Sequence, residues 1–249
     1  MNFKDKVVII TGGGSGIGLE TAKQYAKAGA KLVVNSIVPD HEQVVKDAVG
    51  TQCVFVHGDI TKPADCKKIV NTAIEKFGRI DILANIAGIV HSGYLLDATE
   101  EDLMQAMDVN VKGSFSMMKY SVEQMIKTGG GVIVNIASVA ALKGHTNRCV
   151  YSASKGALIS LSRAVATEYV SQGIRVNVLC PGTTLTGALN KRIEESPDPD
   201  ATRKEFMARQ PIGRLGMESE IAHTVLFASC DESSYMTGSV IVIDGGMTC

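Results

Sequence analysis

Short apolar runs alternate with longer amphipathic stretches from one end of the chain to the other. Runs bounded by glycine or polar residues are typical of strands that are buried on both faces. Seven such strands are predicted, at 7–10, 31–34, 53–56, 81–84, 132–136, 174–179 and 240–243. Helical periodicity predicts intervening helices at 17–28, 63–77, 100–127 and 149–170. Strands joined by helical crossovers indicate a parallel sheet with helices on both faces.

The domain organisation follows from what interrupts this alternation. No Pro/Ser-rich linker, charge block or internal repeat divides the 249 residues. We therefore expect one α/β domain over 1–249, a Rossmann-type doubly wound parallel sheet of seven strands. A polar, proline-containing insert lies between the sixth strand and the last helix. We predict that this insert forms a mobile substrate flap over about 186–212.

Composition narrows the class of protein. The formal net charge of −1 gives no basic surplus for binding nucleic acid or an anionic membrane. No apolar run approaches the roughly 20 residues of a membrane-spanning helix. The six cysteines form no Cys-x-x-Cys pair and have no histidine cluster beside them, so no metal site is predicted. Unpaired thiols are typical of a cytoplasmic protein.

A glycine-rich segment, TGGGSGIG at 11–18, joins the first predicted strand to the first helix. Ligands of parallel sheets bind beyond the carboxyl ends of the strands. Glycines there let the backbone approach a pyrophosphate, and the helix N-terminus offers it unpaired N–H groups. The position of this segment after the first strand predicts a dinucleotide site.

The end of the second strand bears on the choice between NAD and NADP. An acidic residue there binds the ribose hydroxyls, whereas a nearby arginine accommodates a 2′-phosphate. This strand ends in Asn35, Ser36 and Ile37, and Ser15 in the glycine-rich segment is also neutral. Asn35 and Ser36 can hydrogen-bond a ribose. The absence of a cation for a phosphate favours NAD over NADP.

Candidate chemistry lies further along the chain. Tyr151 and Lys155 are four residues apart and share one helix face. A neighbouring ammonium stabilises the phenolate and lowers the tyrosine pKa, which makes the phenol a usable general acid/base. Ser138 follows the fifth strand, so its hydroxyl lies at the same sheet edge and can hold a substrate carbonyl. Asn110 lies inside a predicted helix, where asparagine is a poor fit, so a side-chain or water partner is expected.

Taken in order, these motifs resemble the short-chain dehydrogenase/reductase family over the whole chain. They are Thr-Gly-x-x-x-Gly-x-Gly at 11–18, Asn-Ile-Ala-Gly at 85–88, Ser138, Tyr-x-x-x-Lys at 151–155, Pro-Gly at 181–182 and Asp-Gly-Gly at 244–246. One departure is Ile86, where the family usually repeats asparagine. Another is Ser36, where NAD-using members usually carry aspartate. The second departure leaves the cofactor choice open.

The resemblance implies a role for each motif. It implies that Tyr151 is the acid/base, that Ser138 orients the reacting oxygen, that Lys155 binds the nicotinamide ribose and that Asn110 holds a water of a proton relay. It implies a homotetramer with the last helix and strand at an interface. The residues implied to bind the cofactor are Gly12, Ser15, Gly16, Ile17, Gly18, Ser36, Asp59, Ile60, Asn85, Gly88, Tyr151, Lys155, Pro181, Gly182, Thr184 and Thr186.

Within this family, the segments 87–91, 139–144 and 147–151 resemble dehydrogenases of small hydroxy and keto acids. Their substrates include 3-hydroxybutyrate and 2-keto-3-deoxy-sugar acids such as 2-keto-3-deoxy-L-fuconate. The resemblance implies that Arg148, Arg192 and Arg209 bind the substrate carboxylate, a pairing that is bidentate and directional. Arg214 is a further candidate. His91 either lines the substrate pocket or has a structural role.

Two alternatives share the fold. An NADPH-dependent 3-oxoacyl thioester reductase needs room for a carrier arm but no carboxylate clamp. A dinucleotide-binding redox sensor, which recognises a partner protein, tends to lose the tyrosine or the lysine. The arginines and the intact Tyr151/Lys155 pair favour an NAD-dependent oxidoreductase. It would transfer a hydride between the cofactor and a secondary alcohol or ketone of a small carboxylic acid.

Overall fold

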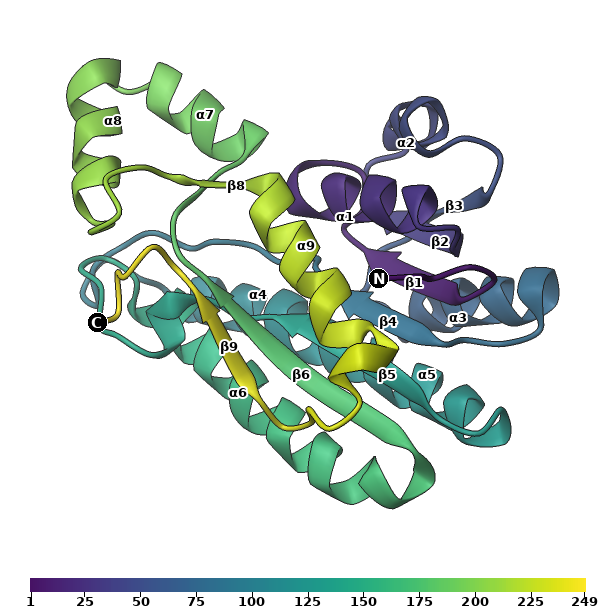
Figure 1. Ribbon diagram of the computed structural model, residues 1–249. Coiled ribbons are helices and arrows are strands. Elements are labelled where there is room, and N and C mark those ends of the chain that lie inside the picture. Colours follow the sequence, from purple (N-terminus) through teal and green to yellow (C-terminus); the bar gives the residue numbers. More distant parts are fainter.

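The computed structural model describes residues 1–249, and a seven-stranded parallel sheet forms its centre (Figure 1). The strand order is β3-β2-β1-β4-β5-β6-β9. The strands are β1 Val7–Thr11, β2 Lys31–Ser36, β3 Cys53–His57, β4 Ile82–Asn85, β5 Gly131–Ile136, β6 Ile174–Pro181 and β9 Val240–Ile243. The Rossmann-type sheet and all seven predicted strands are thereby confirmed.

The strand order creates a crevice at one place on the carboxyl edge. The chain winds outward from β1 to β2 and β3, and β4 then pairs with the other side of β1. Loops that leave two such neighbouring strands diverge, and ligands of doubly wound sheets bind between them. Thr11 pairs with Asn85 at the ends of β1 and β4. The glycine-rich segment therefore lies beside the 86–88 loop.

Two hydrophobic cores hold the helices against the sheet. Alternate residues of β1 point to opposite faces, Val7 and Ile9 into one core and Val8 and Ile10 into the other. Helices α3, α5 and α6 pack into the first core, whereas α1 and α9 pack into the second (Figure 1). The helices are α1 Gly16–Lys27, α2 His41–Val49, α3 Pro63–Phe77, α4 Glu100–Met107, α5 Ser114–Lys127, α6 Cys149–Tyr169, α7 Gly187–Glu194, α8 Pro199–Ala208 and α9 Glu218–Ser229.

The helix predicted over 100–127 is interrupted. A π-helical turn, Asp108–Gly113, separates α4 from α5. Such turns occur frequently at functional sites. This one contains Asn110, whose side chain is fully buried and hydrogen-bonded to a loop outside the helix. The interruption thus coincides with a tertiary contact of Asn110.

The segment predicted as a flap is built from two helices, α7 and α8, which stand clear of the sheet at its carboxyl edge (Figure 1). The proline-containing stretch begins α8, because the Asp198 carboxylate accepts a hydrogen bond from the amide of Ala201 and Pro199 follows that cap. Ile193, Phe206 and Leu215 form a separate small core. A short parallel pair, β7 Thr184–Leu185 with β8 Gly216–Met217, joins the two ends of the flap.

Two further observations bear on the classes considered above. None of the helices has the length and apolar character needed to cross a membrane. No group of three or more His, Cys, Asp or Glu side chains is arranged to hold a metal ion.

Candidate active site

The glycine-rich segment forms a tight turn between β1 and α1. Gly12 and Gly16 adopt positive φ angles of 65° and 55°. A Cβ atom on Gly18 would lie 2.1 Å from the carbonyl oxygen of Gly12. No side chain caps the first turn of α1, so its N–H groups are free to receive an anion. These features fit the pyrophosphate of a nicotinamide dinucleotide.

The polar side chains at the end of β2 already form hydrogen bonds within the fold, which the sequence does not indicate. The Asn35 amide donates to the carbonyls of Val56 and Gly58, so it braces β3 and is not free for a ribose. The Ser36 hydroxyl accepts a hydrogen bond from the amide of Val38 and lies 2.9 Å from Nδ1 of His41. Ser36 therefore remains at the ribose corner, together with a histidine that the sequence analysis did not single out.

Three other predicted cofactor residues offer less to a nucleotide than the resemblance implies. The Asp59 carboxylate accepts hydrogen bonds from the amide and hydroxyl of Thr61. The Ile60 side chain is buried in the first core. The Asn85 amide points across the sheet and donates to Oδ1 of Asn135 at 2.8 Å, which differs from the expected ribose contact. Asp59, Ile60 and the amide nitrogen of Asn85 thus have contacts within the fold, whereas Oδ1 of Asn85 is buried without a partner.

Lys155 lies at the floor of the crevice with 4% of its surface exposed. Its Nζ donates to the carbonyl oxygen of Ile136 at 2.8 Å. Burial lowers the pKa of Lys155 to about 8. A Cβ atom on Gly88 would lie 3.0 Å from this Nζ and 2.9 Å from Oδ1 of Asn110. Glycine at position 88 thus keeps the ammonium accessible from the crevice, where it can bind ribose hydroxyls.

Tyr151 lies one helical turn before Lys155 on α6. Burial raises the pKa of the phenol, whereas the hydrogen bond with Ser138 and the positive charge of Arg148 lower that pKa in part. Lys155, from which the lowering was expected, has its Nζ 6.0 Å from the centroid of the tyrosine ring and is not among the groups that shift this pKa. The net rise keeps the phenol protonated, so it is suited to donate a proton to a ketone oxygen.

Both N–H groups of the Asn110 side chain are used within the fold. Its Oδ1 accepts from the amide of Ile89 at 2.9 Å, and its Nδ2 donates to the carbonyl of Ile89 and to Oγ of Ser154, both at 3.0 Å. Ser154 in turn donates to the carbonyl of Tyr151. The Asn110 Oδ1 keeps a second lone pair, so the water that the resemblance implies stays a prediction. The side chain also fixes the loop after β4 against α6 and thereby positions Tyr151.

One cavity of about 1080 Å³ connects the cofactor residues with the substrate residues. The predicted residues that line it are Ile17, Gly88, Ser138, Arg148, Tyr151, Pro181, Gly182, Thr184, Thr186, Arg192 and Arg209. The fold therefore brings together side chains that the sequence separates by almost two hundred positions.

The arginines converge from three helices. Arg148 precedes the first residue of α6, and its guanidinium donates to Asn147. The guanidinium carbons of Arg192 and Arg209 lie 5.8 Å and 4.7 Å from the centroid of the Phe206 ring. Burial lowers the pKa of Arg148, and the positive charges of Arg192 and Arg209 lower it further. This mutual influence shows that all three charges act on the same space.

Only one of the three arginines has a carboxylate partner. Arg209 forms an ion pair with Glu205, which lies one turn earlier on α8. Arg192 has only the hydroxyl of Ser92 as a hydrogen-bond partner, at 3.5 Å. Arg148 bonds only to oxygens of Asn147. Two guanidinium groups of the cavity that Tyr151 lines, those of Arg148 and Arg192, therefore remain without a carboxylate partner.

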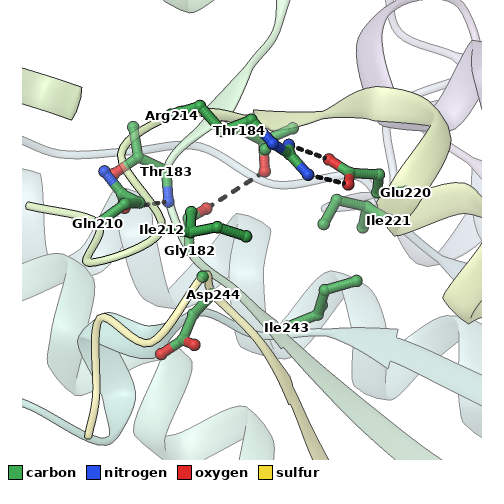
Figure 2. A pocket seen from close by; sticks show the side chains of 12 residues that line it. Gly182, Thr183, Thr184, Gln210, Ile212, Arg214, Glu220, Ile221, Ile243 and Asp244 are labelled. Atoms are coloured by element: carbon green, nitrogen blue, oxygen red, sulfur yellow. Dashed lines mark hydrogen bonds and ion pairs between the residues drawn. The ribbon is translucent and has the colours of Figure 1, made fainter.

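Two candidates lie elsewhere. His91 is not among the residues that line the cavity, and its Nε2 lies 3.3 Å from the carboxylate of Asp102 in the capping box of α4. This arrangement corresponds to the structural alternative. Arg214 forms a bidentate ion pair with Glu220, with distances of 2.8 and 2.7 Å, in a second pocket (Figure 2). The Arg214 guanidinium therefore connects the segment before β8 with α9.

Several residues of the site were not found by sequence reasoning. His145 lines the cavity, and its Nε2 is buried without a partner. Burial, followed by the charge of Arg209, lowers the pKa of this histidine. Gln210 accepts a hydrogen bond from the amide of Thr183, which attaches the end of the flap to the strand end beside the cavity (Figure 2). None of these residues lies in a motif, so no local signal marks them.

Comparisons with known proteins agree with this geometry. The family described as Enoyl-(Acyl carrier protein) reductase matches residues 12–248. An uncharacterized oxidoreductase of Thermotoga maritima is 50% identical, over 100% of this chain and 99% of its own. "Dehydrogenase/reductase SDR family member 6" of Aquarana catesbeiana is 40% identical, over 97% and 96% of the two chains.

Two more similarities concern named enzymes. The 2-keto-3-deoxy-L-fuconate dehydrogenase of Xanthomonas campestris pv. campestris is 39% identical, over 98% of this chain and 80% of its own. The crystal structure of levodione reductase superposes with a TM-score of 0.95 and 31% identity, over 99% of both chains. The chain belongs to the short-chain dehydrogenase/reductase family and is an oxidoreductase of that family.

Proposed function

We propose that this single-domain chain is an NAD-dependent dehydrogenase of a small carboxylic acid that bears a secondary alcohol or ketone. The observation that carries the proposal is the cavity in which Tyr151 and Ser138 face two arginines without carboxylate partners, Arg148 and Arg192. Arginine pairs with carboxylates in a bidentate, directional manner, so such a substrate is both held and oriented.

The proposed chemistry divides between cofactor and protein. NAD accepts or supplies the hydride when it is bound. The glycine-rich turn and the N-terminus of α1 hold its pyrophosphate, and Lys155 holds the nicotinamide ribose. Tyr151 holds or donates the proton at its phenolic oxygen, and Ser138 orients the reacting oxygen of the substrate. Asn110 acts as a positioning residue through Ser154 and the backbone of Tyr151.

NAD is proposed over NADP because no basic side chain occurs at Ser15, Ser36 or Ile37. A 2′-phosphate at the end of β2 would have no cation at these positions to pair with. Discrimination between NAD and NADP at the end of β2 therefore depends on hydrogen-bonding groups and not on a lysine or arginine.

The substrate is proposed to be a 2-keto-3-deoxy-sugar acid such as 2-keto-3-deoxy-L-fuconate, with 3-hydroxybutyrate as the smaller alternative. The cavity of about 1080 Å³ and the similarity to a 2-keto-3-deoxy-L-fuconate dehydrogenase support the larger acid. A 3-oxoacyl thioester reductase would leave the two unpaired arginines without a function.

The test is a screen of hydroxy acids and deoxy-sugar acids by nicotinamide absorbance, with NAD and with NADP. Arg148→Met should raise KM for the acid about ten- to a hundred-fold, because a lost hydrogen bond to a charged group costs about 1.5–3 kcal/mol. Arg163→Met, on the same helix but exposed, is the matched control. Equal turnover of the acid and of its neutral methyl ester by the parent enzyme would rule out the carboxylate clamp.

We also propose a cytoplasmic homotetramer. All six cysteines are unpaired, which supports a reducing compartment. Phe227 of α9 and Val242 of β9 expose 44% and 43% of their surfaces, which supports an interface at the last helix and strand. Light scattering coupled to gel filtration measures the mass directly, and a monomeric mass would contradict the proposal.

A further inference from the structure

His41 lies at the junction of two segments that flank the adenosine ribose in dinucleotide-binding folds. It is the first residue of α2, which follows β2. A Cβ atom on Gly14, in the glycine-rich turn, would lie only 2.0 Å from Nδ1 of His41 and 2.4 Å from its Cγ. The imidazole therefore occupies the space that any side chain at position 14 would need. The same Nδ1 lies 2.9 Å from the Ser36 hydroxyl at the end of β2.

The hydrogen bonds at this corner leave one donor available. The Ser36 hydroxyl already accepts from the amide of Val38. If its proton goes to Nδ1 of His41, the imidazole retains an N–H at Nε2; if Nδ1 donates instead, the hydroxyl retains its proton. The His41–Ser36 pair thus keeps one N–H or O–H in either tautomer. The Asn35 amide is used within the sheet and does not contribute.

We propose that His41 is the residue that determines specificity at the adenosine ribose, an inference that rests on the proposed nicotinamide cofactor but not on the proposed substrate. An acidic residue at the end of β2 accepts hydrogen bonds from ribose hydroxyls and repels a 2′-phosphate. The His41–Ser36 pair is a hydrogen-bond donor instead of a carboxylate. It donates to the 2′-hydroxyl of NAD or to the 2′-phosphate of NADP, so His41 reduces the preference for NAD and keeps it modest.

The test measures binding rather than turnover. NADH and NADPH are titrated by their own fluorescence, which the protein does not obscure because it contains no Trp. The fragments 5′-AMP and adenosine 2′,5′-bisphosphate are titrated by calorimetry. Two variants are compared with the parent chain. His41→Phe keeps a ring over Gly14 but has no N–H group, whereas His41→Gln keeps a side-chain N–H group.

His41→Phe is expected to weaken NADPH and the bisphosphate about ten-fold or more, because the lost hydrogen bond is to a charged group. It should weaken NADH and AMP only about two- to ten-fold, because that hydrogen bond is to a neutral hydroxyl. His41→Gln should bind all four ligands almost as tightly as the parent chain. This pattern in all four ligands supports the assignment.

Other outcomes overturn it. Unchanged affinities, or equal losses for the ligands with and without a 2′-phosphate, would mean that the ring only packs against Gly14. Tighter NADPH binding by His41→Phe would mean that the imidazole obstructs the phosphate. Failure of the parent chain to bind either NADH or NADPH would instead contradict the proposed function, and the two failures are therefore distinguishable.

Discussion

Replacement of Lys155 by methionine should stabilise the cofactor-free protein at neutral pH while it removes activity. The pKa of this buried lysine is lowered from about 10.5 to about 8, because burial disfavours its charged form. This lowering corresponds to about 3 kcal/mol, at about 1.36 kcal/mol per pKa unit. Below pH 8 the ammonium is charged in both states, so the folded protein carries the whole of this cost.

The methionine variant removes that cost but also leaves the carbonyl of Ile136 without its hydrogen bond. A hydrogen bond of this kind contributes about 1 kcal/mol, so the variant should be more stable than the parent by about 2 kcal/mol near pH 7. As the pH rises from about 8 to about 10, folded parent releases the proton while unfolded parent retains it. The free energy of unfolding of the parent should therefore rise by about 2 kcal/mol relative to the variant.

Urea unfolding of both proteins at the two pH values checks this reasoning. The difference between parent and variant cancels the titration of every other group that behaves alike in the two. Lys76→Met, on the exposed side of α3, is the matched control for loss of a lysine. A parent-to-variant difference that does not change between pH 7 and pH 10 would show that burial does not perturb Lys155.

Three further substitutions test individual parts of the site. Tyr151→Phe should bind NADH normally and lose turnover about 10²–10⁴-fold in steady-state assays, because general acid/base catalysis is removed; turnover within a few-fold of the parent would contradict its role. Ser36→Asp should increase the ratio of kcat/KM for NAD over NADP by repulsion of the 2′-phosphate, and an unchanged ratio would place that phosphate elsewhere. Gly88→Ala should weaken NADH binding about ten-fold or more in fluorescence titrations, because its Cβ would lie 3.0 Å from Nζ of Lys155; an unchanged Kd would show that Lys155 does not reach the ribose.

The sheet could be predicted from the sequence because each of its strands is buried on both faces. Val7, Val8, Ile9 and Ile10 are all fully or almost fully buried, so the strand is a continuous apolar run. Helix α2 gave no comparable signal, because only Val45 among its nine residues is buried. The π-helical turn was also invisible, since it coincides with a bond between Asn110 and Ile89, 21 residues away in the chain.

The site was predictable to the extent that its residues lie in contiguous motifs at strand ends. Tyr151, Ser138 and Gly88 reach the same cavity because parallel strands end at one edge of the sheet. The contacts of His91 and Asn85 could not be predicted, because their partners, Asp102 and Asn135, belong to other elements. Local spacing contains no information about such partners.

The arrangement of the arginines connects substrate charge with the position of the flap. Arg148 precedes α6, which packs against the sheet. Arg192 belongs to α7 and Arg209 follows α8, and neither of these two helices packs against the sheet. Their charges lower the pKa of Arg148, so they destabilise its positive form in the absence of an anion. A bound carboxylate removes this repulsion and favours approach of the flap to α6.

The proposed cofactor site adjoins the other end of the same flap. Thr186 caps α7 through a hydrogen bond from the amide of Leu189, and its Cγ2 would lie 3.7 Å from a Cβ atom on Gly16. A dinucleotide on the glycine-rich turn would therefore contact Thr186, the first residue of the flap. The proposed substrate carboxylate would contact Arg192, which lies in the last turn of α7. With the proposed cofactor and substrate, both ligands would favour one flap position, and closure would then exclude water from the hydride path. We expect that cofactor binding precedes and strengthens binding of the acid, and calorimetric titration of the acid with and without NADH measures this coupling. Equal affinity of the acid in both titrations would show that α7 does not connect the two sites.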